Sequence, residues 1–292
     1  MLMRILFAQT FLTLVTYAAV GDLSHVHIAT EIFFNLPPIA ELINDHARPL
    51  LPFSSHEEPQ NLIDDLAVNL ENQGMVEMAA GLASPGRQKI SGIFDALSLL
   101  LVFTVDETAT RHQLESLLQL RILYMNRCHN QNHDPSDPDI QKVMIRISHQ
   151  LEPEQGTLSI DQIVARKFQA RLSSQTHCHE CHEQLHCFNP ILALPDVLEI
   201  AIIRPLGDST LVQVTENLNL ENFAHSIDVG PMRYTLRAIV FESATEGGDT
   251  FTGAIKIGSD WFNLDSHGNR TPGAPQLESS TVSTIFYQRL SQ

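Results

Sequence analysis

The densest set of groups able to do chemistry lies in residues 177–187, HisCysHisGluCysHisGluGlnLeuHisCys. Cys178 and Cys181 are separated by two residues, a spacing that lets two thiolates reach one tetrahedral ion, typically zinc. Two interpretations fit this segment: a structural zinc site, or reduced cysteines that pack as small apolar groups. Neither interpretation gives a ligand role to Cys187 or to the other histidines of the segment.

The chain has four cysteines, and none of them precedes Cys128. This distribution does not resemble the disulfide framework of a secreted domain and favours a reducing compartment. Residues 1–21 have the outline of a signal peptide, with one early arginine and an apolar stretch. Because polar residues interrupt that stretch, we expect a cytoplasmic or nuclear protein, with secretion as the alternative if residues 1–21 are cleaved.

Composition limits the possible partners. Of the 292 residues, 43% are hydrophobic and 18% are charged, which is typical of a globular chain with a large core. The formal net charge of -16 should repel nucleic acid and anionic lipid, and it favours a neutral or basic protein partner. No stretch after the N-terminus reaches 18 uninterrupted apolar residues, so we expect no membrane-spanning helix there.

The elements that must position these groups change in character along the chain. Apolar residues recur at three and four positions in 58–72 and 88–103, which predicts helices. Residues 25–45 predict two helices separated at Pro37-Pro38, and the polar, proline-containing segment 129–139 predicts a loop. After residue 191 the pattern predicts short strands with turns between them. The fold class expected is therefore α+β, with a helical first half and a mainly antiparallel second half.

Four segments of the second half, in this order and spacing, resemble the ubiquitin-specific proteases, which are ubiquitin carboxyl-terminal hydrolases with a papain-like cysteine-protease fold. These segments are residues 194–204, 234–241, 261–265 and 285–289. The first half matches more loosely, at 21–24, at 33–37 and at Gln88, Ile93 and Phe94. The resemblance covers residues 17–290. It implies one domain over 1–292 that divides into a helical thumb (1–118), antiparallel fingers (119–190) and a palm sheet (191–292).

The same resemblance assigns the catalytic positions of the family to Ala19, Ser24, Thr250 and Asp265. The nucleophilic cysteine falls on Ser24, the histidine base on Thr250 and the oxyanion asparagine on Ala19, whereas the acid that orients the base is retained as Asp265. A papain-like reaction needs a thiolate, an imidazole base and oxyanion donors. Loss of one triad member typically lowers the rate by several orders of magnitude, so we expect an inactive member.

Structural roles also fit these residues. Ser24 precedes a helical run and is predicted to be its N-cap, while Asp265 is predicted to lie in a turn and to accept bonds from backbone amides. A serine hydrolase would need a new base. His25 and His27 are near in sequence, but a helix would point both of them away from position 24.

The resemblance also implies further ligands for the metal site. Cys178 and Cys181 fall where the second cysteine pair of the fingers belongs, and Cys128 falls in the first pair. The partner position of Cys128 is Gln131, and either His129 or His133 could replace the missing cysteine. The expected zinc ligands are Cys128, Cys178, Cys181 and His133.

The function expected is that of a non-catalytic module that binds ubiquitin, a ubiquitinated protein or another protein. One alternative is an active deubiquitinating hydrolase, but no shift of register supplies a cysteine before Cys128. A second alternative is a scaffold that no longer binds ubiquitin. Asp249 and Phe251 replace the glycine and tyrosine of the family loop that the ubiquitin tail passes.

Overall fold

The computed structural model describes residues 23–45, 59–75, 79, 82, 89–104, 116–130, 140–144, 146–152, 156–168, 171–205, 207–220, 232–245 and 248–290. The chain divides into two compact units. The first comprises residues 1–114, 238–275 and 281–284, and the second comprises residues 115–237, 276–280 and 285–292. Two strands, β11 (Arg233–Thr245) and β16 (Val282–Arg289), pass from one unit into the other.

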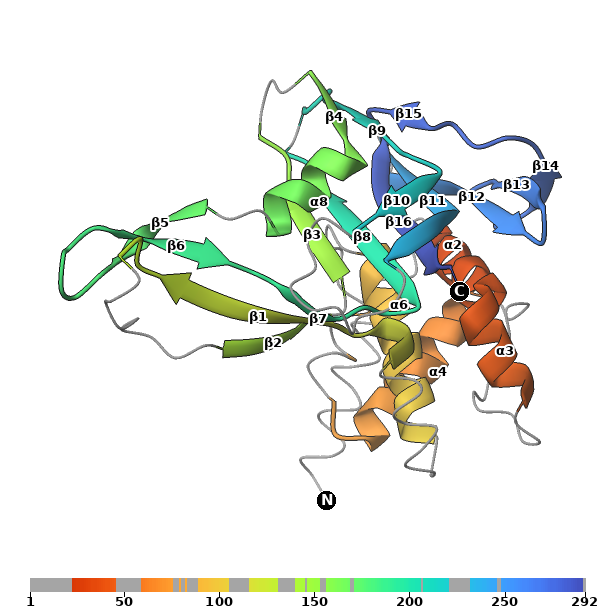
Figure 1. Ribbon diagram of the computed structural model, residues 1–292. Coiled ribbons are helices and arrows are strands. Elements are labelled where there is room, and N and C mark those ends of the chain that lie inside the picture. The colour runs from red at the N-terminus through yellow and green to blue at the C-terminus, as the bar shows by residue number, and fades with distance from the viewer. Residues whose placement is uncertain are drawn as a thin grey trace. The chain divides into compact units, whose positions relative to one another are not determined.

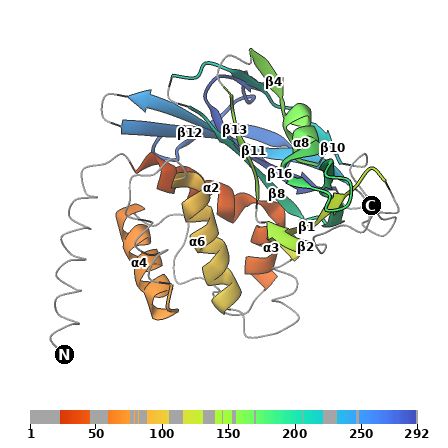
Figure 2. The ribbon, with the colours of Figure 1, turned by 90° about the vertical axis from the view of Figure 1, so that its left-hand side faces the viewer.

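The first unit combines helices with one edge of an antiparallel sheet (Figures 1 and 2). Its strands lie in the order β14-β13-β12-β11. Besides its part of β11 and β16, it contains α2 (Ser24–Asn35), α3 (Pro37–Asp45), α4 (Pro59–Asn72), α6 (Lys89–Thr104), β12 (Gly248–Ile257), β13 (Asp260–Leu264) and β14 (Arg270–Pro272).

The helix break predicted at Pro37-Pro38 is confirmed. Leu36 ends α2 with extended backbone, at φ -69° and ψ 119°. A residue that precedes proline avoids the helical region because the proline ring clashes with its backbone, so the helix cannot continue through Leu36. The two prolines then open α3, where the lack of an N–H donor is harmless because the first turn of a helix has no partner for it. The helices predicted over 58–72 and 88–103 are also present, as α4 and α6.

Helix α2 is the centre of the first unit. Val26, Ile28, Ile32 and Phe33 have no exposed surface, and Figure 2 shows α2 beside α6 with α4 next to it. The Phe33 ring meets that of Phe94 on α6 edge to face, with 5.2 Å between the centroids. Burial of several large apolar side chains, each contributing about 1.5–3 kcal/mol, fixes α2 in place.

Helix α2 also packs against β12, and a glycine permits this approach. A Cβ atom at Gly253 would lie 3.1 Å from the Ile239 carbonyl oxygen and 3.4 Å from Ile28 Cγ2. The missing side chain lets the helix come close to the strand that carries Thr250. Ser24 and Thr250, two of the positions compared with catalytic ones, therefore lie on elements in direct contact.

The second unit is mainly β-structure. One sheet has the order β2-β1-β6-β5, with β7 also paired to β1, and a small sheet has the order β15-β9-β4. A third group has the order β16-β8-β3, in which β3 and β8 are parallel, and β10 pairs with the start of β11. The elements are β1 (Leu120–Arg127), β2 (Ile140–Met144), β3 (Arg146–Gln150), β4 (Thr157–Ser159), α8 (Ile160–Phe168), β5 (Arg171–His177), β6 (Gln184–Phe188), β7 (Ile191–Ala193), β8 (Val197–Ile203), β9 (Leu211–Gln213), β10 (Asn217–Asn219) and β15 (Glu278–Ser279).

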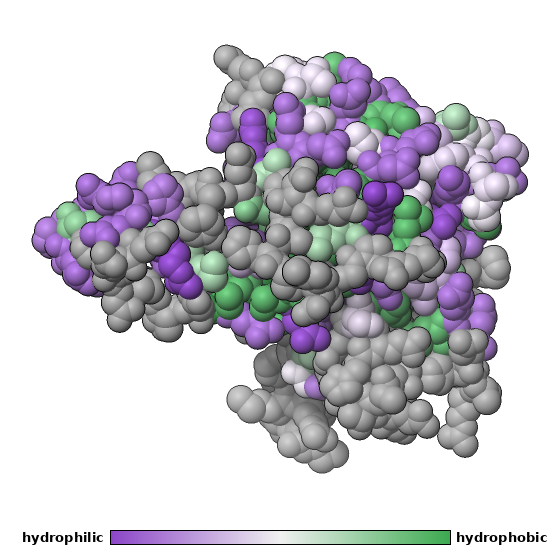
Figure 3. Space-filling model, in the orientation of Figure 1, coloured by the Kyte–Doolittle hydropathy of each residue, from purple (hydrophilic) through white to green (hydrophobic). Residues whose placement is uncertain are grey.

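Strands β1, β2, β5 and β6 form the long ribbon seen in Figure 1. The described surface at its tip is hydrophilic (Figure 3), because His177, His179, Glu180, His182 and Glu183 are exposed there. The α+β class with helices and mainly antiparallel sheets is confirmed. Within the described ranges, no helix combines the length and the apolar character needed to cross a membrane.

Candidate functional sites

Ser24, the position compared with the family nucleophile, is the first residue of α2 and is only 1% exposed. Its Oγ accepts a hydrogen bond of 2.8 Å from the backbone N–H of Phe251, which is 227 residues away on β12. Phe251 is itself 3% exposed, so both partners are buried. The hydroxyl thus joins the start of the helix to the strand and satisfies an N–H that water cannot reach.

The prediction that Ser24 caps its own helix is wrong. Leu23 occupies the N-cap position, makes no side-chain capping bond, and accepts the N–H of Val26 at its carbonyl oxygen at 2.9 Å. A serine caps a helix when its oxygen accepts the N–H two or three residues later. At position 24 the oxygen accepts an N–H from another element, so the serine supports tertiary packing rather than the helix end.

Thr250, the position compared with the base, immediately precedes Phe251 on β12 and pairs with Ser243 of β11. The bond between Ser24 and Phe251 therefore brings positions 24 and 250 together in the folded first unit. The Phe251 ring lies 6.1 Å, centroid to centroid, from the ring of His25, which is buried. Threonine has no group that takes up a proton near neutral pH, so this pair of positions lacks a base of its own.

Asp265, the retained acid, directly follows β13, whose last residue Leu264 pairs with Gly253 of β12. Its predicted place in a turn is confirmed. Asp265 Oδ1 accepts the backbone N–H groups of His267 and Asn269, each at 2.9 Å, and Oδ2 accepts the Asn269 side-chain amide at 2.9 Å. The Asn269 amide lowers the pKa of the Asp265 carboxyl. The carboxylate therefore organises its own loop.

The 265–270 loop is also tied to α2. Arg270 donates through Nε to Glu31 Oε2 at 3.1 Å and through a second nitrogen to the same oxygen. Glu31 is a largely buried carboxylate, and burial is tolerated because the guanidinium is beside it. Gly268, with φ +76°, brings the loop backbone close to His27 and to the Glu31 side chain. Ala19, the position compared with the oxyanion asparagine, lies outside the described residues.

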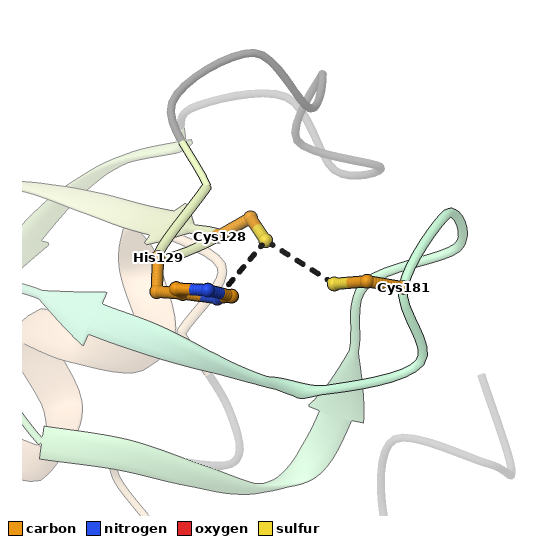
Figure 4. Close-up of side chains that lie close together, drawn as sticks. All are labelled: Cys128, His129 and Cys181. Carbon is orange, nitrogen blue, oxygen red and sulfur yellow. Dashed lines mark hydrogen bonds between the residues drawn. The ribbon is translucent and has the colours of Figure 1, made fainter.

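In the second unit, three ligand atoms come together at the tip of the ribbon (Figure 4). Cys128 Sγ lies 3.5 Å from Cys181 Sγ and 3.9 Å from His129 Nδ1. In a tetrahedral zinc site with Zn–S of ~2.3 Å and Zn–N of ~2.0 Å, neighbouring sulfurs are about 3.8 Å apart and sulfur and nitrogen about 3.5 Å apart. The observed separations are close to these edges, so the donor set fits a zinc ion.

Cys178 lies at the start of a tight turn between β5 and β6. Its carbonyl oxygen accepts the His182 N–H at 2.9 Å, and its N–H donates to the backbone carbonyl oxygen of Glu183 at 2.8 Å. His182 has φ +59°, a left-handed conformation that non-glycine residues adopt at a cost. The backbone N–H of Cys181 lowers the pKa of the Cys178 thiol to about 6, whereas burial raises the pKa of Cys128 to about 11. Backbone donors thus favour the thiolate form of Cys178, which is the form that binds a metal.

Of the expected ligands, Cys128, Cys178 and Cys181 lie together, since each of the other two thiols interacts with that of Cys128. His133 and Gln131 fall outside the described residues. His129, the other histidine considered, is the one that the structure places beside Cys128, and its Nδ1 also lies 2.7 Å from Glu183 Oε2. The structure thus contains a Cys/His cluster suited to a metal ion.

Cys187 takes no part in this cluster. Its thiol donates to Asn126 Oδ1 at 2.9 Å and lies 3.4 Å from the Tyr124 hydroxyl.

Sequence reasoning missed two features of the sites, the Phe251 N–H and the Glu183 carboxylate. The first is a backbone group that any residue at 251 would supply. The second had a faint signal, because Glu183 lies only two residues after Cys181.

Comparison with known proteins finds solved structures that have a similar fold. No protein-family model and no curated protein matches the sequence. A chain of the SAGA DUB module of Ubp8, Sgf11, Sus1 and Sgf73 bound to monoubiquitin superposes with a TM-score of 0.66, covering 93% of this chain and 68% of that chain at 13% identity. The same module bound to ubiquitin aldehyde gives 0.62 over the same shares at 13% identity, and a yeast SAGA module with an altered Sgf73 gives 0.57 at 12%. The predicted ubiquitin-specific-protease-like fold is thereby confirmed.

Proposed function

We propose that this chain is a ubiquitin-specific-protease-like module without hydrolytic activity that binds ubiquitin, a ubiquitinated protein or another protein. The thumb, fingers and palm over 1–118, 119–190 and 191–292, and a cytoplasmic or nuclear location, are part of the proposal. The chain has four cysteines, three of them within residues 178–187, a distribution that favours the reducing compartments over secretion.

One observation carries the non-catalytic part. The hydroxyl of Ser24 is buried and accepts the N–H of Phe251. A nucleophile must reach a substrate carbonyl and must give its proton to a base. Exposure of Ser24 for attack would leave the Phe251 N–H without this acceptor, and Thr250 supplies no base. The two positions that would carry the reaction have structural roles instead.

The activity test uses a fluorogenic ubiquitin C-terminal amide. We expect the purified chain to release no fluorophore above a protein-free blank, and electrophilic ubiquitin probes that trap thiols should form no adduct. Turnover that Ser24→Ala abolishes would establish a serine hydrolase. Turnover that persists in Ser24→Ala would show that the catalytic positions are assigned incorrectly.

The binding part rests on the fold, because the similar solved structures are complexes with monoubiquitin and ubiquitin aldehyde. Titration of isotope-labelled ubiquitin by NMR tests it. We expect resonance shifts that saturate with added protein and cluster on one face of ubiquitin. If no resonance shifts or broadens, the module is a scaffold that no longer binds ubiquitin.

We also propose that the fingertip cluster holds one structural zinc ion through Cys128, Cys178, Cys181 and His129. The metal would join the end of β1 to the turn between β5 and β6, and binding then contributes to folding of the ribbon. The ion itself supplies only coordination, while His129 must exchange its contact with Glu183 for the metal.

Elemental analysis of protein prepared without chelators tests the zinc proposal, with close to one zinc per chain expected. Cys178→Ser should lower the zinc content and the melting temperature, whereas Cys187→Ser, the matched control in the same ribbon, should retain the metal. His129→Ala should weaken zinc binding. If His129→Ala binds zinc as the unaltered chain does and His133→Ala does not, His133 is the fourth ligand.

A further inference from the structure

Cys128 and Cys181 are the two thiols of the fingertip cluster whose sulfur atoms the structure places 3.5 Å apart. They are 53 residues apart in the chain and come from different segments, the end of β1 and the turn between β5 and β6. Neither cysteine forms a disulfide in the structure; Cys128 is mostly buried beside Leu185 and Cys181 is half-buried. A disulfide needs the sulfurs at ~2.0 Å, so the two sulfur atoms must approach each other by about 1.5 Å for the bond to form.

We propose that Cys128 and Cys181 form a reversible disulfide when a hydroperoxide oxidises the fingertip, and that formation of this bond releases the bound metal ion. The second half of this inference rests on the proposed zinc site, whereas the first half needs only the two thiols.

The reaction balances with a hydroperoxide as the oxidant. The O–O bond and two S–H bonds break, one S–S bond forms, and the two sulfurs together lose two electrons. The peroxide is reduced to one alcohol and one water, or to two waters if it is hydrogen peroxide. When both sulfurs begin as metal-bound thiolates, two protons are taken from solvent and the metal leaves as a dication.

The rest of the cluster explains why the metal would leave. The disulfide removes two of the four donors, so that Cys178 and His129 remain, which is too few for a tetrahedral site. The new bond joins the same two segments that the metal joins. The tip of the ribbon therefore stays linked in both states, and oxidation exchanges a metal link for a covalent one. Such transient disulfides are the form in which reducing compartments use oxidation as a signal.

Access and local bonding favour this pair over the other thiols. Cys181 is the most exposed of the four cysteines, which suits it to meet the oxidant first. Cys178 has the thiol whose thiolate form the backbone favours, but it is only 2% exposed, and its backbone N–H and C=O groups are both bonded within the turn, so the oxidant reaches Cys181 more readily. The Cys187 thiol takes no part in the cluster, because it donates its hydrogen bond to Asn126 Oδ1 instead.

In the test, the reduced chain is treated with hydrogen peroxide in the presence of a chromogenic zinc chelator. We expect two of the four thiols to disappear and the intact mass to fall by two hydrogens. Zinc should be released in step with thiol loss, and a dithiol reductant should reverse the mass change. Peptide mapping without reduction should link Cys128 to Cys181. Cys187→Ala, the matched control, should behave in the same way as the unaltered chain.

The outcomes of this test distinguish the disulfide inference from the zinc proposal. In Cys128→Ser the disulfide should be absent and peroxide should add oxygen to Cys181 instead. A link between Cys178 and Cys181 in the unaltered chain, or oxygen addition without any disulfide, overturns the inference. If the reduced chain contains no zinc but the Cys128–Cys181 bond still forms, the zinc proposal fails and the disulfide stands. If zinc is present and leaves without disulfide formation, the inference fails and the zinc site stands.

Discussion

Replacement of Ser24 by alanine separates a structural role of this residue from a catalytic one. The substitution removes the Oγ that accepts the Phe251 N–H at 2.8 Å and leaves that donor in a buried place. An unsatisfied buried donor costs about 1–3 kcal/mol. Replacing a catalytic nucleophile has a different effect: activity is lost, and the free energy of unfolding often stays unchanged or increases.

The expected loss of stability can be converted into a melting temperature. For domains of 150–250 residues, each kcal/mol shifts the Tm by about 2–4 °C. Loss of about 1–3 kcal/mol should therefore lower the transition that reports the first unit by several degrees. Because the chain has two compact units, calorimetry should be fitted with separate transitions where they are resolved.

Ser98→Ala is the matched control. Ser98 is also a buried serine in the first unit, but its Oγ donates to the Phe94 carbonyl oxygen at 2.7 Å within α6. That carbonyl can keep its helical bond when the hydroxyl is lost, because serine bonds of this kind only supplement the helix. We expect Ser98→Ala to change stability by less than about 0.5 kcal/mol.

Hydrogen exchange gives the residue-level measurement. The Phe251 amide should exchange faster in Ser24→Ala than in the unaltered chain, while amides of the second unit should not change. Equal stability of Ser24→Ala and Ser98→Ala, together with unchanged protection of the Phe251 amide, would refute the structural role of Ser24.

Three further predictions concern other parts of the chain. Gly253→Ala should destabilise the first unit by about 1–3 kcal/mol in denaturant titration, since its Cβ would meet Ile239 and Ile28 at 3.1 and 3.4 Å. Gly92→Ala on α6, whose Cβ would have no atom within 4 Å, should instead stabilise by up to about 1 kcal/mol. His182→Gly should stabilise the fingertip by up to about 1 kcal/mol. The left-handed conformation of His182 costs ~1–2 kcal/mol, and the larger backbone entropy that glycine loses on folding offsets ~0.5–1 kcal/mol of the gain. An unchanged or lower Tm would contradict this prediction. Burial lowers the pKa of the His149 side chain below its usual 6.5, so the unfolded chain binds this proton more tightly, and the free energy of unfolding should fall as the pH drops through about 6.5. His149→Gln should reduce this loss of stability between pH ~7 and ~5. An identical loss in both proteins would exclude His149 as its source.

The elements of the fold were largely predictable because local rules set them. The two prolines after Leu36 fix the boundary between α2 and α3 through sterics alone, and the apolar spacing of 88–103 requires a buried helix such as α6. The strands after residue 191 also followed from their composition. The pairing of parallel β3 with β8 was not foreseen, because strand order depends on contacts between segments about 50 residues apart.

The candidate sites were predictable only in part, for reasons that follow from the kinds of atoms involved. Side-chain ligands leave a spacing in the sequence, and Cys178 and Cys181 were identified from it. The partner of Ser24 is a backbone N–H, which every residue except proline carries, so no residue type marks it. The contact of His129 with Cys128 depends on the backbone turn after β1, which residue spacing does not determine.

The bond between Ser24 and Phe251 connects the stability of the first unit to the proposed absence of hydrolytic activity. In a cysteine hydrolase the group at the start of this helix must remain available, so its neighbours cannot depend on it for a hydrogen bond. A serine is a better acceptor than a thiol for a backbone N–H, because sulfur forms longer and weaker bonds. Once a serine accepts this N–H, return to cysteine would weaken a buried bond and would still lack a base at position 250. If position 24 corresponds to the nucleophile as proposed, serine there supplies a contact that holds α2 against β12, and replacing it by cysteine would weaken that contact.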